Sequence, residues 1–487
     1  MLESLRGTDF LGNPPEVFIL ASPLFFLAIP NGRSVEMAHD NDPRLAKSRK
    51  AAEQAIQLHR QYRGKIQIIP KCPIREFSDF SIWYTPGVAE PCRAIVKEKS
   101  RVYDFTNKGN SIAIVTDGTR VLGLGDIGPE AGLPVMEGKA LLFKYLGGVD
   151  AVPICLGTTH PDEFIQTVKH LQPTFGGINL EDISQPKCFK ILDQLRKEMD
   201  IPVWHDDQQG SGTALLAGLL NALRIVKKDL ATIRVAMIGM GAANVAVYRL
   251  LKHSGLDPGR VIACDRQGTL HRHRRDIEAR QDEFVDKWRV CQETNATGLQ
   301  GTIAEALRGA DVCVAFAGPQ VVQAQWISTM APNAVVFACA NPTPEIWPWE
   351  AKEAGARIVA TGRGDFPNQV NNSLVFPGVF RGALDVRAST ITDEMALAAA
   401  HALADYAVNQ GIHDDAILPT MAQWDVYPQV AVATALQAQA QGLAGLHTPA
   451  AQLHADATRI IRQAREATQL LMPIMDAPFR SQEGSRT

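Results

Sequence analysis

The 487-residue sequence predicts an α/β protein with two main domains and a helical C-terminal segment. Short apolar runs alternate with helical stretches along most of the chain, which is typical of α/β folds. A glycine-rich turn between an apolar run and a helix lies near residue 240. The chain is also too long for one ordinary core. We place the N-terminal α/β domain at 41–205, a parallel-sheet domain at 206–400, and the helical segment at 401–487.

The first 40 residues do not follow this pattern. They contain "VFILASPLFFLAIP" (17–30), which is apolar but interrupted by prolines and too short for a comfortable membrane span. The residues before this run lack the basic start of a signal peptide, and Met37 follows it. We expect 1–40 to be an extension, either disordered or upstream of the true start, and a docked interfacial helix is the alternative.

The N-terminal domain begins with a helix that ends at a glycine, a common C-cap. Strand-like apolar runs and a helical stretch follow in alternation. The predicted elements are helices at 44–64 and 160–172 and strands at 111–118, 149–156 and 176–180.

The second domain starts with an apolar run, a glycine turn and a helix in "IRVAMIGMGAANVAVYRLLKHSG" (233–255). Gly239 allows the tight turn, and Gly241 lets backbone N–H groups approach a pyrophosphate at the helix N-terminus. Asn244 occupies the place of the third glycine of this motif, and the next apolar run ends at Asp265. The sequence therefore predicts a Rossmann-like dinucleotide-binding domain. A glycine turn needed only for packing is the alternative. Helical periodicity from about 391 to 473 predicts the C-terminal helices.

Composition excludes several classes of protein. The hydrophobic fraction is 46%, and the formal net charge of -3 comes from well mixed signs, so we expect no nucleic-acid partner and no membrane association. Eight scattered cysteines show no C-x-x-C spacing, which favours a reduced, cytoplasmic protein over a zinc or redox site.

Two adjacent pairs of acids each follow an apolar run: Glu181-Asp182 and Asp206-Asp207. Neighbouring like charges repel unless a cation lies between them. Carboxylates converging at strand ends are the hard oxygen ligands that suit Mg²⁺ or Mn²⁺. The alternative is that each pair caps the helix that follows it. Two pairs close to a nucleotide-binding turn favour the metal.

Seven segments together resemble the successive blocks of the bacterial malic enzymes. The resemblance runs in family order from about residue 50 to 400 and implies metal-dependent oxidative decarboxylation of malate to pyruvate and carbon dioxide, with NAD(P) as the oxidant. The segments are "WYTPGVAEPCRAI" (83–95), "VTDGTRVLGLGDIGP" (115–129), "VMEGKALLFKYLGGVDAVPICLGT" (135–158), "INLEDISQPKCFKILDQL" (178–195), "HDDQQGSGTALLAGLLNAL" (205–223), "FACANPTPEI" (337–346) and "GDFPNQVNNSLVFPGVFRGALDVRA" (364–388).

The resemblance implies roles for individual residues. Lys139 matches the catalytic lysine that acts as a base, Asp206 assists it, and Tyr84 matches the general acid that protonates the enol. Without the resemblance, Lys139 is an exposed lysine at a helix start and Tyr84 an aromatic packed before a proline turn. The metal ligands implied by the resemblance are Glu181, Asp182 and Asp207.

Malate carboxylates require cations and amides. Arg120 matches the arginine that clamps malate, and a guanidinium can hold a carboxylate in bidentate fashion. Asn341 and Asn372 match amides placed against substrate and nicotinamide, and Asn371 is included beside them. Asparagines before turns are often purely structural. The resemblance also implies a homodimer or higher homo-oligomer, with Tyr84 contributed across the interface.

The cofactor is predicted to be NAD, with NADP possible. A free carboxylate at Asp265 would accept hydrogen bonds from the ribose hydroxyls and repel a 2′-phosphate. Arg266, aided by basic residues at 272–275, would instead bind that phosphate; a plain solvated loop is the other interpretation of this basic run. The predicted cofactor-binding residues are Gly239, Gly241, Ala242, Ala243, Asn244, Asp265, Arg266 and Asn341.

Two other functions stay open at the level of sequence. One is a sensor that keeps the nucleotide and metal sites but has lost catalytic activity. The presence of Lys139 and Tyr84 argues against it. The other is a related enzyme that only decarboxylates oxaloacetate, or that converts malate to lactate without releasing reduced cofactor.

Overall fold

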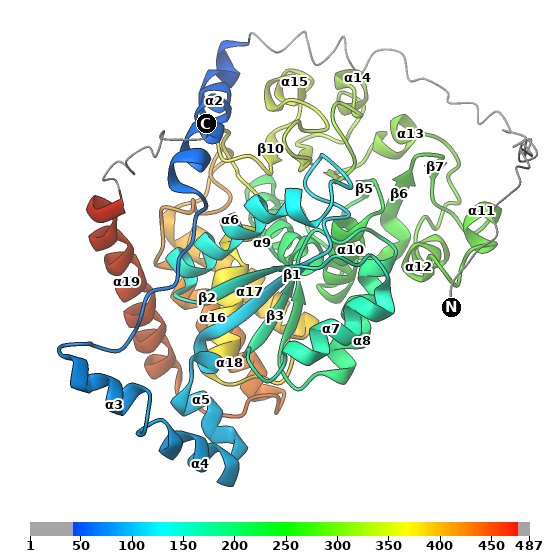
Figure 1. Cartoon of the computed structure of the whole chain (residues 1–487). Helices are drawn as coiled ribbons and strands as arrows, with labels where there is room; N and C mark the ends of the chain where they lie inside the picture. Colours follow the sequence, from blue (N-terminus) through cyan, green and yellow to red (C-terminus); the bar gives the residue numbers. More distant parts are fainter. Residues whose placement is uncertain (1–41, 476–487) are drawn as a thin grey trace, which may run out of the picture. The chain divides into compact units, whose positions relative to one another are not determined.

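The computed structural model describes residues 42–475 (Figure 1). The predicted extension at 1–40 lies outside the described residues. Among the described residues, 42–49 belong to a separate unit, in which Asp42 caps a short 3₁₀ helix by accepting a hydrogen bond from the backbone N–H of Arg44. This helix, η1 (Pro43–Leu45), leads directly into α2 (Ala46–Tyr62).

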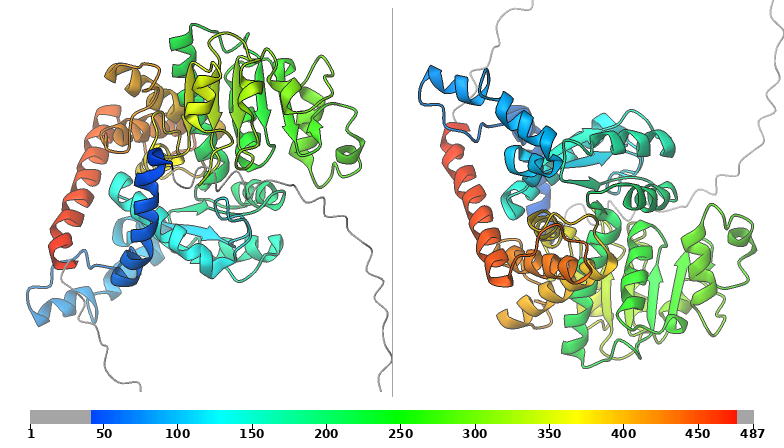
Figure 2. Two further views of the ribbon diagram at one scale, coloured as in Figure 1. Left: turned by 90° about the horizontal axis from the view of Figure 1, so that it is seen from above. Right: turned by 90° about the horizontal axis from the view of Figure 1, so that it is seen from below.

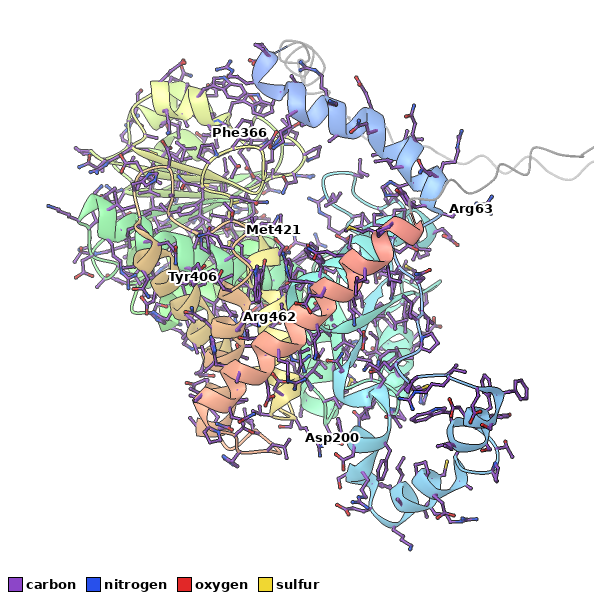
Figure 3. The ribbon with its side chains drawn as sticks, turned by 90° about the vertical axis from the view of Figure 1, so that its left-hand side faces the viewer. Arg63, Asp200, Phe366, Tyr406, Met421 and Arg462 are labelled. Atoms are coloured by element: carbon purple, nitrogen blue, oxygen red, sulfur yellow. The ribbon has the colours of Figure 1, made fainter. Side chains whose placement is uncertain are left out.

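From residue 63 to 110 the chain forms short helices without a buried core of their own. Figures 1 and 3 show α3 and α4 projecting from the side of the sheets, and we call residues 66–105 the arm. Its elements are η2 (Phe77–Asp79), α3 (Phe80–Trp83), α4 (Ala89–Lys97), η3 (Lys99–Arg101) and α5 (Val102–Phe105), and η4 (Asn107–Asn110) then leads into the first strand.

A four-stranded parallel sheet follows, in the order β2-β1-β3-β4. Strands β1, β3 and β4 are buried throughout, as expected of a parallel sheet covered by helices. Strand β2 lies at the edge and is only partly buried. The elements are β1 (Ser111–Thr116), α6 (Pro129–Gly147), β2 (Asp150–Cys155), α7 (Pro161–Leu171), β3 (Gly177–Leu180), α8 (Lys187–Glu198) and β4 (Val203–His205).

The second sheet has six strands in the order β10-β9-β8-β5-β6-β7, and β7 alone is antiparallel within it. Reversal of strand order at β5 is the Rossmann arrangement, in which ligands bind beyond the carboxyl ends of the strands. The strands are β5 (Val235–Ile238), β6 (Val261–Asp265), β7 (Gly268–Thr269), β8 (Val312–Ala315), β9 (Val335–Ala338) and β10 (Ile358–Thr361). Helices α10 (Ala242–His253), η6 (Pro258–Arg260), α11 (Arg275–Glu278), α12 (Val285–Glu293), α13 (Ile303–Leu307), α14 (Ala324–Ile327) and α15 (Pro348–Glu353) connect them.

The two sheets share one hydrophobic core. Buried residues of β1, α9, β5 and α16 belong to a single cluster, so the sheets are joined by packed helices (Figure 2). Helix α19, which carries Arg462 in Figure 3, packs against both α18 and α6 and so returns to the first sheet. The connecting and C-terminal elements are η5 (Asp206–Gly210), α9 (Ser211–Val226), η7 (Asn372–Leu374), α16 (Phe376–Asp385), α17 (Asp393–Gln410), α18 (Val426–Ala440) and α19 (Ala450–Met475).

The structure confirms the α/β class and the type of each element predicted from the sequence. Element ends differ by one to three residues from those predicted, since backbone hydrogen bonding stops before the apolar pattern does. The periodic C-terminal stretch is three helices, with breaks between α17 and α18 and between α18 and α19. Among residues 42–475 no helix combines the length and apolar character that a membrane span requires.

Candidate active site

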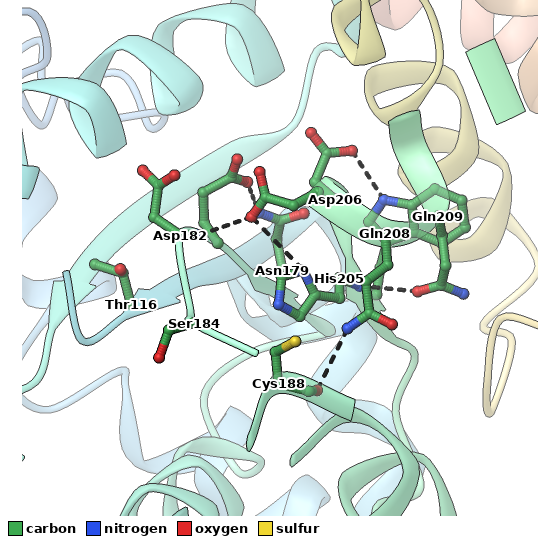
Figure 4. A network of polar contacts seen from close by, with 12 residues as sticks. Thr116, Asn179, Asp182, Ser184, Cys188, His205, Asp206, Gln208 and Gln209 are labelled. Atoms are coloured by element: carbon green, nitrogen blue, oxygen red, sulfur yellow. Dashed lines mark hydrogen bonds and ion pairs between the residues drawn. The ribbon is translucent and has the colours of Figure 1, made fainter. Parts of the chain in front are cut away.

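The two acid pairs meet at the carboxyl edge of the four-stranded sheet. Strands β3 and β4 are adjacent and parallel, so the residues that follow them lie side by side. Carboxylate oxygens of Glu181, Asp182 and Asp207 all lie within 4.8 Å of one another. Figure 4 shows Asp182 and Asp206 at the ends of their strands. The structure therefore brings together the three predicted metal ligands.

Lys139 reaches these acids from α6. Its Nζ atom lies 2.7 Å from Asp206 Oδ2 and 3.0 Å from Glu181 Oε1. The ammonium also lies 4.5 Å from the centre of the Phe376 ring. The alternative of an exposed lysine is wrong, because the side chain of Lys139 is only 9% exposed.

The charges in this cluster do not balance, since Lys139 pairs with Asp206 and Glu181 while two further carboxylates, those of Asp182 and Asp207, lie beside them. Burial raises the pKa of Asp182 to about 8, with a further contribution from Asp207, and burial likewise raises the pKa values of Glu181, Asp206 and Asp207. Burial alone would lower the pKa of Lys139, but the carboxylates of Asp206 and Glu181 outweigh it and raise that pKa. The neighbouring imidazole of His205 adds no charge, because burial lowers its pKa to about 4.

Asp182 has two further features typical of a ligand-binding residue. Its backbone is left-handed, with φ of 54°, a conformation that costs a non-glycine residue on the order of 1–3 kcal/mol. Its Oδ2 atom is buried and has no hydrogen-bond partner. A buried acceptor without a donor is costly, so the site fits a cation at this atom.

A π-helical turn, η5, holds Asp206 in place. Trp204 donates a hydrogen bond from Nε1 to Asp206 Oδ1 over 3.0 Å. A methyl group added at Gly210 would lie 1.9 Å from the same oxygen and 3.0 Å from Cβ of Asn372. Only glycine fits at this position, and Asn372 lies beside the turn as a predicted substrate contact requires. π-Helical turns are common at functional sites.

The loop that follows β1 carries Arg120 to the acids. The backbone N–H of Arg120 donates to the carbonyl of Asp182 over 3.0 Å, while its guanidinium is exposed. The charge of Arg120 is close enough to lower the pKa values of Asp182 and Asp207, although burial outweighs it. A cation beside a metal-type cluster is suited to a substrate carboxylate.

Several supporting residues were not predicted from the sequence. Asn179 donates from Nδ2 to Glu181 Oε2 over 2.8 Å and so orients a metal ligand. Asp117, fully buried, accepts hydrogen bonds from the backbone and hydroxyl of Thr119 and pairs with Lys187 at 2.6 Å, which fixes the base of the Arg120 loop. Asn179 and Asp117 each bond a residue two positions along the chain, so a polar residue in or directly after a buried strand was the available signal, whereas the pairing of Asp117 with Lys187, 70 residues away, has no local signal.

The glycine turn has the predicted geometry at the carboxyl end of β5. Gly239 has a φ of 82°, which favours glycine. Asn244 is buried, and its Nδ2 donates to the carbonyls of Ile238 and Gly239, so it holds the turn closed. This contact explains why an asparagine is accepted in place of the third glycine. Gly241, Ala242 and Ala243 lie at the N-terminus of α10, where a pyrophosphate is expected.

Asp265 does not have the free carboxylate that the sequence suggested. Its Oδ1 accepts from the backbone N–H of Gln267 and from Arg274, and its Oδ2 accepts from Arg274 and from Lys287. The interpretation of the basic run as a solvated loop is wrong for Arg274, which is buried and also pairs with Asp276. The prediction of NAD rested on a free carboxylate at Asp265, and that premise is wrong.

The predicted asparagines lie near the carboxyl ends of β9 and β10. A methyl group added at Gly362 would lie 2.5 Å from Nδ2 of Asn341, and Asn371 donates to the carbonyl of Gly362 over 3.2 Å. Asn371 also caps η7 through the backbone N–H of Ser373. Both amide atoms of Asn371 are thus engaged with backbone, and its contact with substrate stays a prediction.

Glu345 is a further unpredicted residue of this region. Its fully buried carboxylate accepts hydrogen bonds from the backbone N–H groups of Ala317 (2.7 Å) and Ala340 (3.0 Å). Burial raises its pKa to about 7. One side chain thereby ties the loop after β8 to the loop after β9 that carries Asn341.

Tyr84 is not brought to the acids within this chain. It ends α3 in the arm, and its side chain is 70% exposed. Figure 1 shows α3 away from the strand ends that carry the acids. Its predicted role as general acid therefore requires a contribution from another copy of the chain.

Comparison with known families decides the identity of this arrangement. The model described as "Malic enzyme, N-terminal domain" matches residues 63–196, and the model described as "Malic enzyme, NAD binding domain" matches residues 208–441. The chain belongs to the malic enzyme family. Among curated relatives, the bifunctional malic/malolactic enzyme of Bacillus subtilis is 46% identical over 393 residues, 80% of this chain and 94% of that protein.

Other malic enzymes are similarly close. The NAD-dependent malic enzyme of Geobacillus stearothermophilus is 47% identical over 381 residues, 78% of each chain. The NADP-dependent malic enzyme of Rhizobium meliloti is 44% identical over 75% of this chain and 47% of its own length. Relatives of both cofactor types are therefore found, and the family indicates a nicotinamide dinucleotide without deciding which.

Solved malic enzymes share the fold. The Entamoeba histolytica structure superposes with a TM-score of 0.87 at 49% identity, covering 89% of this chain and 91% of that one. The Pyrococcus horikoshii structure gives a TM-score of 0.81 at 46% identity, covering 87% and 98%. The fold of this chain is thus that of solved malic enzymes.

Proposed function

We propose that this chain catalyses the metal-dependent oxidative decarboxylation of (S)-malate to pyruvate and carbon dioxide, with reduction of NAD or NADP. The observation that carries this proposal is the buried Lys139–Asp206 pair set directly beside the cluster of Glu181, Asp182 and Asp207. In a malic enzyme this combination supplies both a base and a metal site.

Glu181, Asp182 and Asp207 would hold Mg²⁺ or Mn²⁺. Their oxygens converge, and the buried Oδ2 of Asp182 lacks a donor, so the donor set fits a hard divalent cation. When bound, the metal supplies Lewis acidity to the hydroxyl and later the carbonyl oxygen of the substrate, and offsets the charge that keeps the pKa of Lys139 high.

Lys139 would accept the hydroxyl proton of malate at Nζ. Loss of that proton accompanies transfer of a hydride from C2 of malate to the nicotinamide, which gives oxaloacetate. Asp206 would hold the resulting ammonium through its 2.7 Å contact with Nζ. Asp206, held by Trp204, would therefore orient the base and stabilise the positive charge of its ammonium form.

Arg120 would bind a malate carboxylate, and Asn372 and Asn341 would orient the substrate and the nicotinamide. Arg120 is exposed on a loop anchored to Asp182, which suits a side chain that closes on a ligand. A methyl group added at Gly123 would lie 2.5 Å from the carbonyl oxygen of Asn341, so the Arg120 loop touches the loop that carries Asn341. Substrate and nicotinamide sites would thus be adjacent.

Tyr84 would protonate the methylene carbon of the enol formed by decarboxylation, and a second copy of the chain would supply it. The arm exposes large apolar side chains that would otherwise face water, which supports a homodimer. They are Ile68 (100% exposed), Phe77 (88%), Ile82 (62%), Trp83 (49%) and Val96 (84%).

Mixing two inactive variants tests this arrangement. Tyr84→Phe removes the tyrosine that one chain supplies, and Lys139→Ala removes the lysine that the other chain supplies, so a heterodimer of the two variants has one intact site of two. About half of the dimers formed on co-expression should be heterodimers, so the mixture should recover about a quarter of wild-type activity. A mixture that stays inactive, although heterodimers form, would contradict a tyrosine supplied by the partner.

Absorbance at 340 nm with malate, Mg²⁺ or Mn²⁺, and each cofactor in turn tests the proposed reaction. Reduced cofactor and pyruvate should form in equal amounts, and chelation should stop both. Reduced cofactor without pyruvate, or turnover that survives thorough chelation, would rule the proposal out.

Conversion of malate to lactate is a second candidate function. It is favoured by the 46% identity to a relative named as a bifunctional malic/malolactic enzyme. In that case lactate would accumulate from malate with only catalytic amounts of cofactor, while absorbance at 340 nm stayed low. A lactate assay beside the 340 nm assay separates the two activities.

The domain limits at 41–205, 206–400 and 401–487 and a cytoplasmic location also stay proposals. All eight cysteines are free, which supports a reducing compartment.

A further inference from the structure

The ribose end of the nucleotide site has a different charge from the one that a lone aspartate would give. At the carboxyl end of β6, all four acceptor positions of the Asp265 carboxylate are filled by Gln267, Arg274 and Lys287. The hydroxyl groups of an NAD ribose would have to displace one of these donors. Asp265 therefore acts first as an anchor for two cations.

The two cations differ in how firmly they are held. Arg274 has a side chain only 9% exposed and makes two hydrogen bonds to Asp265 and two to Asp276. Lys287, on α12, makes a single 2.9 Å contact with Asp265 and is 20% exposed. Lys287 is thus the donor that can leave at least cost, because Arg274 and Gln267 would continue to satisfy Asp265.

The surrounding charge is positive. Two cations, Arg274 and Lys287, pair with the carboxylates of Asp265 and Asp276, and a third cation, Arg266, follows Asp265 directly in the chain. Arg266 is exposed and forms an ion pair with no carboxylate of the described residues. A phosphate monoester accepts hydrogen bonds and carries about two negative charges, so it matches these donors better than a ribose hydroxyl does.

We propose that Lys287 is the residue that sets cofactor preference, by turning from Asp265 to the 2′-phosphate of NADP, and that this chain prefers NADP. Arg266 adds a second donor, while Arg274 stays on Asp265 and cancels its repulsion of the phosphate. The proposal rests on the proposed function only in taking the cofactor to be a nicotinamide dinucleotide.

Direct binding of NADPH and NADH, followed by nicotinamide fluorescence on the full chain, tests the proposal without any turnover. Wild type should bind NADPH more tightly than NADH. Lys287→Met should weaken NADPH binding by about tenfold, equivalent to 1.4 kcal/mol, and leave NADH binding within about twofold. Lys287→Arg should restore the preference.

Lys252→Met is the matched control, because Lys252 makes the same kind of 2.9 Å ion pair, with Glu293, on another helix. It should change neither dissociation constant. In wild type, added salt should weaken NADPH binding more than NADH binding. In Lys287→Met, added salt should weaken the binding of the two cofactors to the same extent.

Tighter wild-type binding of NADH, or equal weakening of both cofactors by Lys287→Met, would overturn the inference even if malate turnover is normal. A selective loss of NADPH binding in a chain that does not turn over malate would support the inference while the proposed function failed. The two failures are therefore distinguishable.

Discussion

Asp207 and Asp265 both come at the end of a buried parallel strand, but their surroundings are opposite. Asp265 accepts four hydrogen bonds and pairs with both Arg274 and Lys287. Asp207 lies within 4.8 Å of two other carboxylates. Lys139, the one buried ammonium beside them, is taken by Asp206 and Glu181. The carboxylate of Asp265 is neutralised by Arg274 and Lys287. The carboxylate of Asp207 pairs with no lysine or arginine of the described residues, which suits a cation from outside the chain.

The pKa shifts reflect this difference. Burial alone would raise the pKa of Asp265, but hydrogen bonds from Arg274 and Lys287 lower it below its usual value. Burial raises the pKa of Asp207, and the charges of Lys139 and Arg120, which lower it, do not reverse this rise. A carboxylate whose pKa is lowered stabilises the fold when ionised, and one whose pKa is raised costs stability when ionised.

Removing a metal ligand or the base Lys139 should have the largest effects. Asp207→Asn and Glu181→Gln should each lower kcat/KM for malate on the order of a thousand-fold, because a lost anionic ligand weakens both metal binding and Lewis acidity. The 340 nm assay and calorimetric Mn²⁺ titration measure the two effects. Asp162→Asn, on an exposed ion pair with Lys190, is the control. Normal Mn²⁺ affinity in Asp207→Asn would show that this acid is not a ligand.

Lys139→Ala should lower kcat by a factor of roughly 100 to 10,000 with the metal saturating, as expected for loss of a general base. Lys144 lies on the same helix as Lys139, but its ammonium is partly exposed and pairs with Asp150 of β2. Lys144→Ala should therefore have little effect. Near-normal malate oxidation by Lys139→Ala would mean that the ammonium serves only to pair Asp206 and Glu181.

The stability of the metal-free chain should change in opposite directions at the two aspartates. Asp265→Asn should lower the free energy of unfolding by about 1–3 kcal/mol, since two cations lose their anion. Asp207→Asn should raise it by a similar amount by removing a poorly compensated charge. Thermal unfolding with chelator present measures both, at about 1 °C per kcal/mol for a chain of 487 residues. A shift of the same sign in both variants would show that Asp207 and Asp265 do not have opposite effects on stability.

The pH dependence of stability tests the same comparison without any substitution. The pKa of Asp182 rises from 3.8 toward about 8 on folding, so the metal-free chain should lose stability as pH rises through this interval. Mg²⁺ replaces the proton, and its stabilising effect should therefore increase over the same interval, by up to about tenfold in affinity per pH unit for each proton released. Unfolding midpoints with and without Mg²⁺ between pH 5 and 8 measure it. An effect of Mg²⁺ that is the same across this range would contradict a raised pKa at Asp182.

The sequence by itself determined the α/β class, the glycine turn at Gly239 and the two acid pairs, because these depend on local periodicity and on residues adjacent in the chain. Resemblance to the malic enzymes added Lys139 and Arg120, which no local pattern distinguishes from surface cations. The structure then placed Lys139 against Asp206 across 67 residues of chain.

Only the tertiary structure decided which charges are matched. Arg274 and Lys287 reach Asp265 from elements 9 and 22 residues away, and Glu345 joins two loops through backbone N–H groups that no sequence pattern marks. Tyr84 was predicted from the resemblance, yet the fold leaves it exposed on the arm. Partners of this kind are set by packing between elements that are separate in sequence. Because electrostatic energies depend steeply on distance and burial, the sequence identifies the charged residues, and only the fold determines which of them are paired.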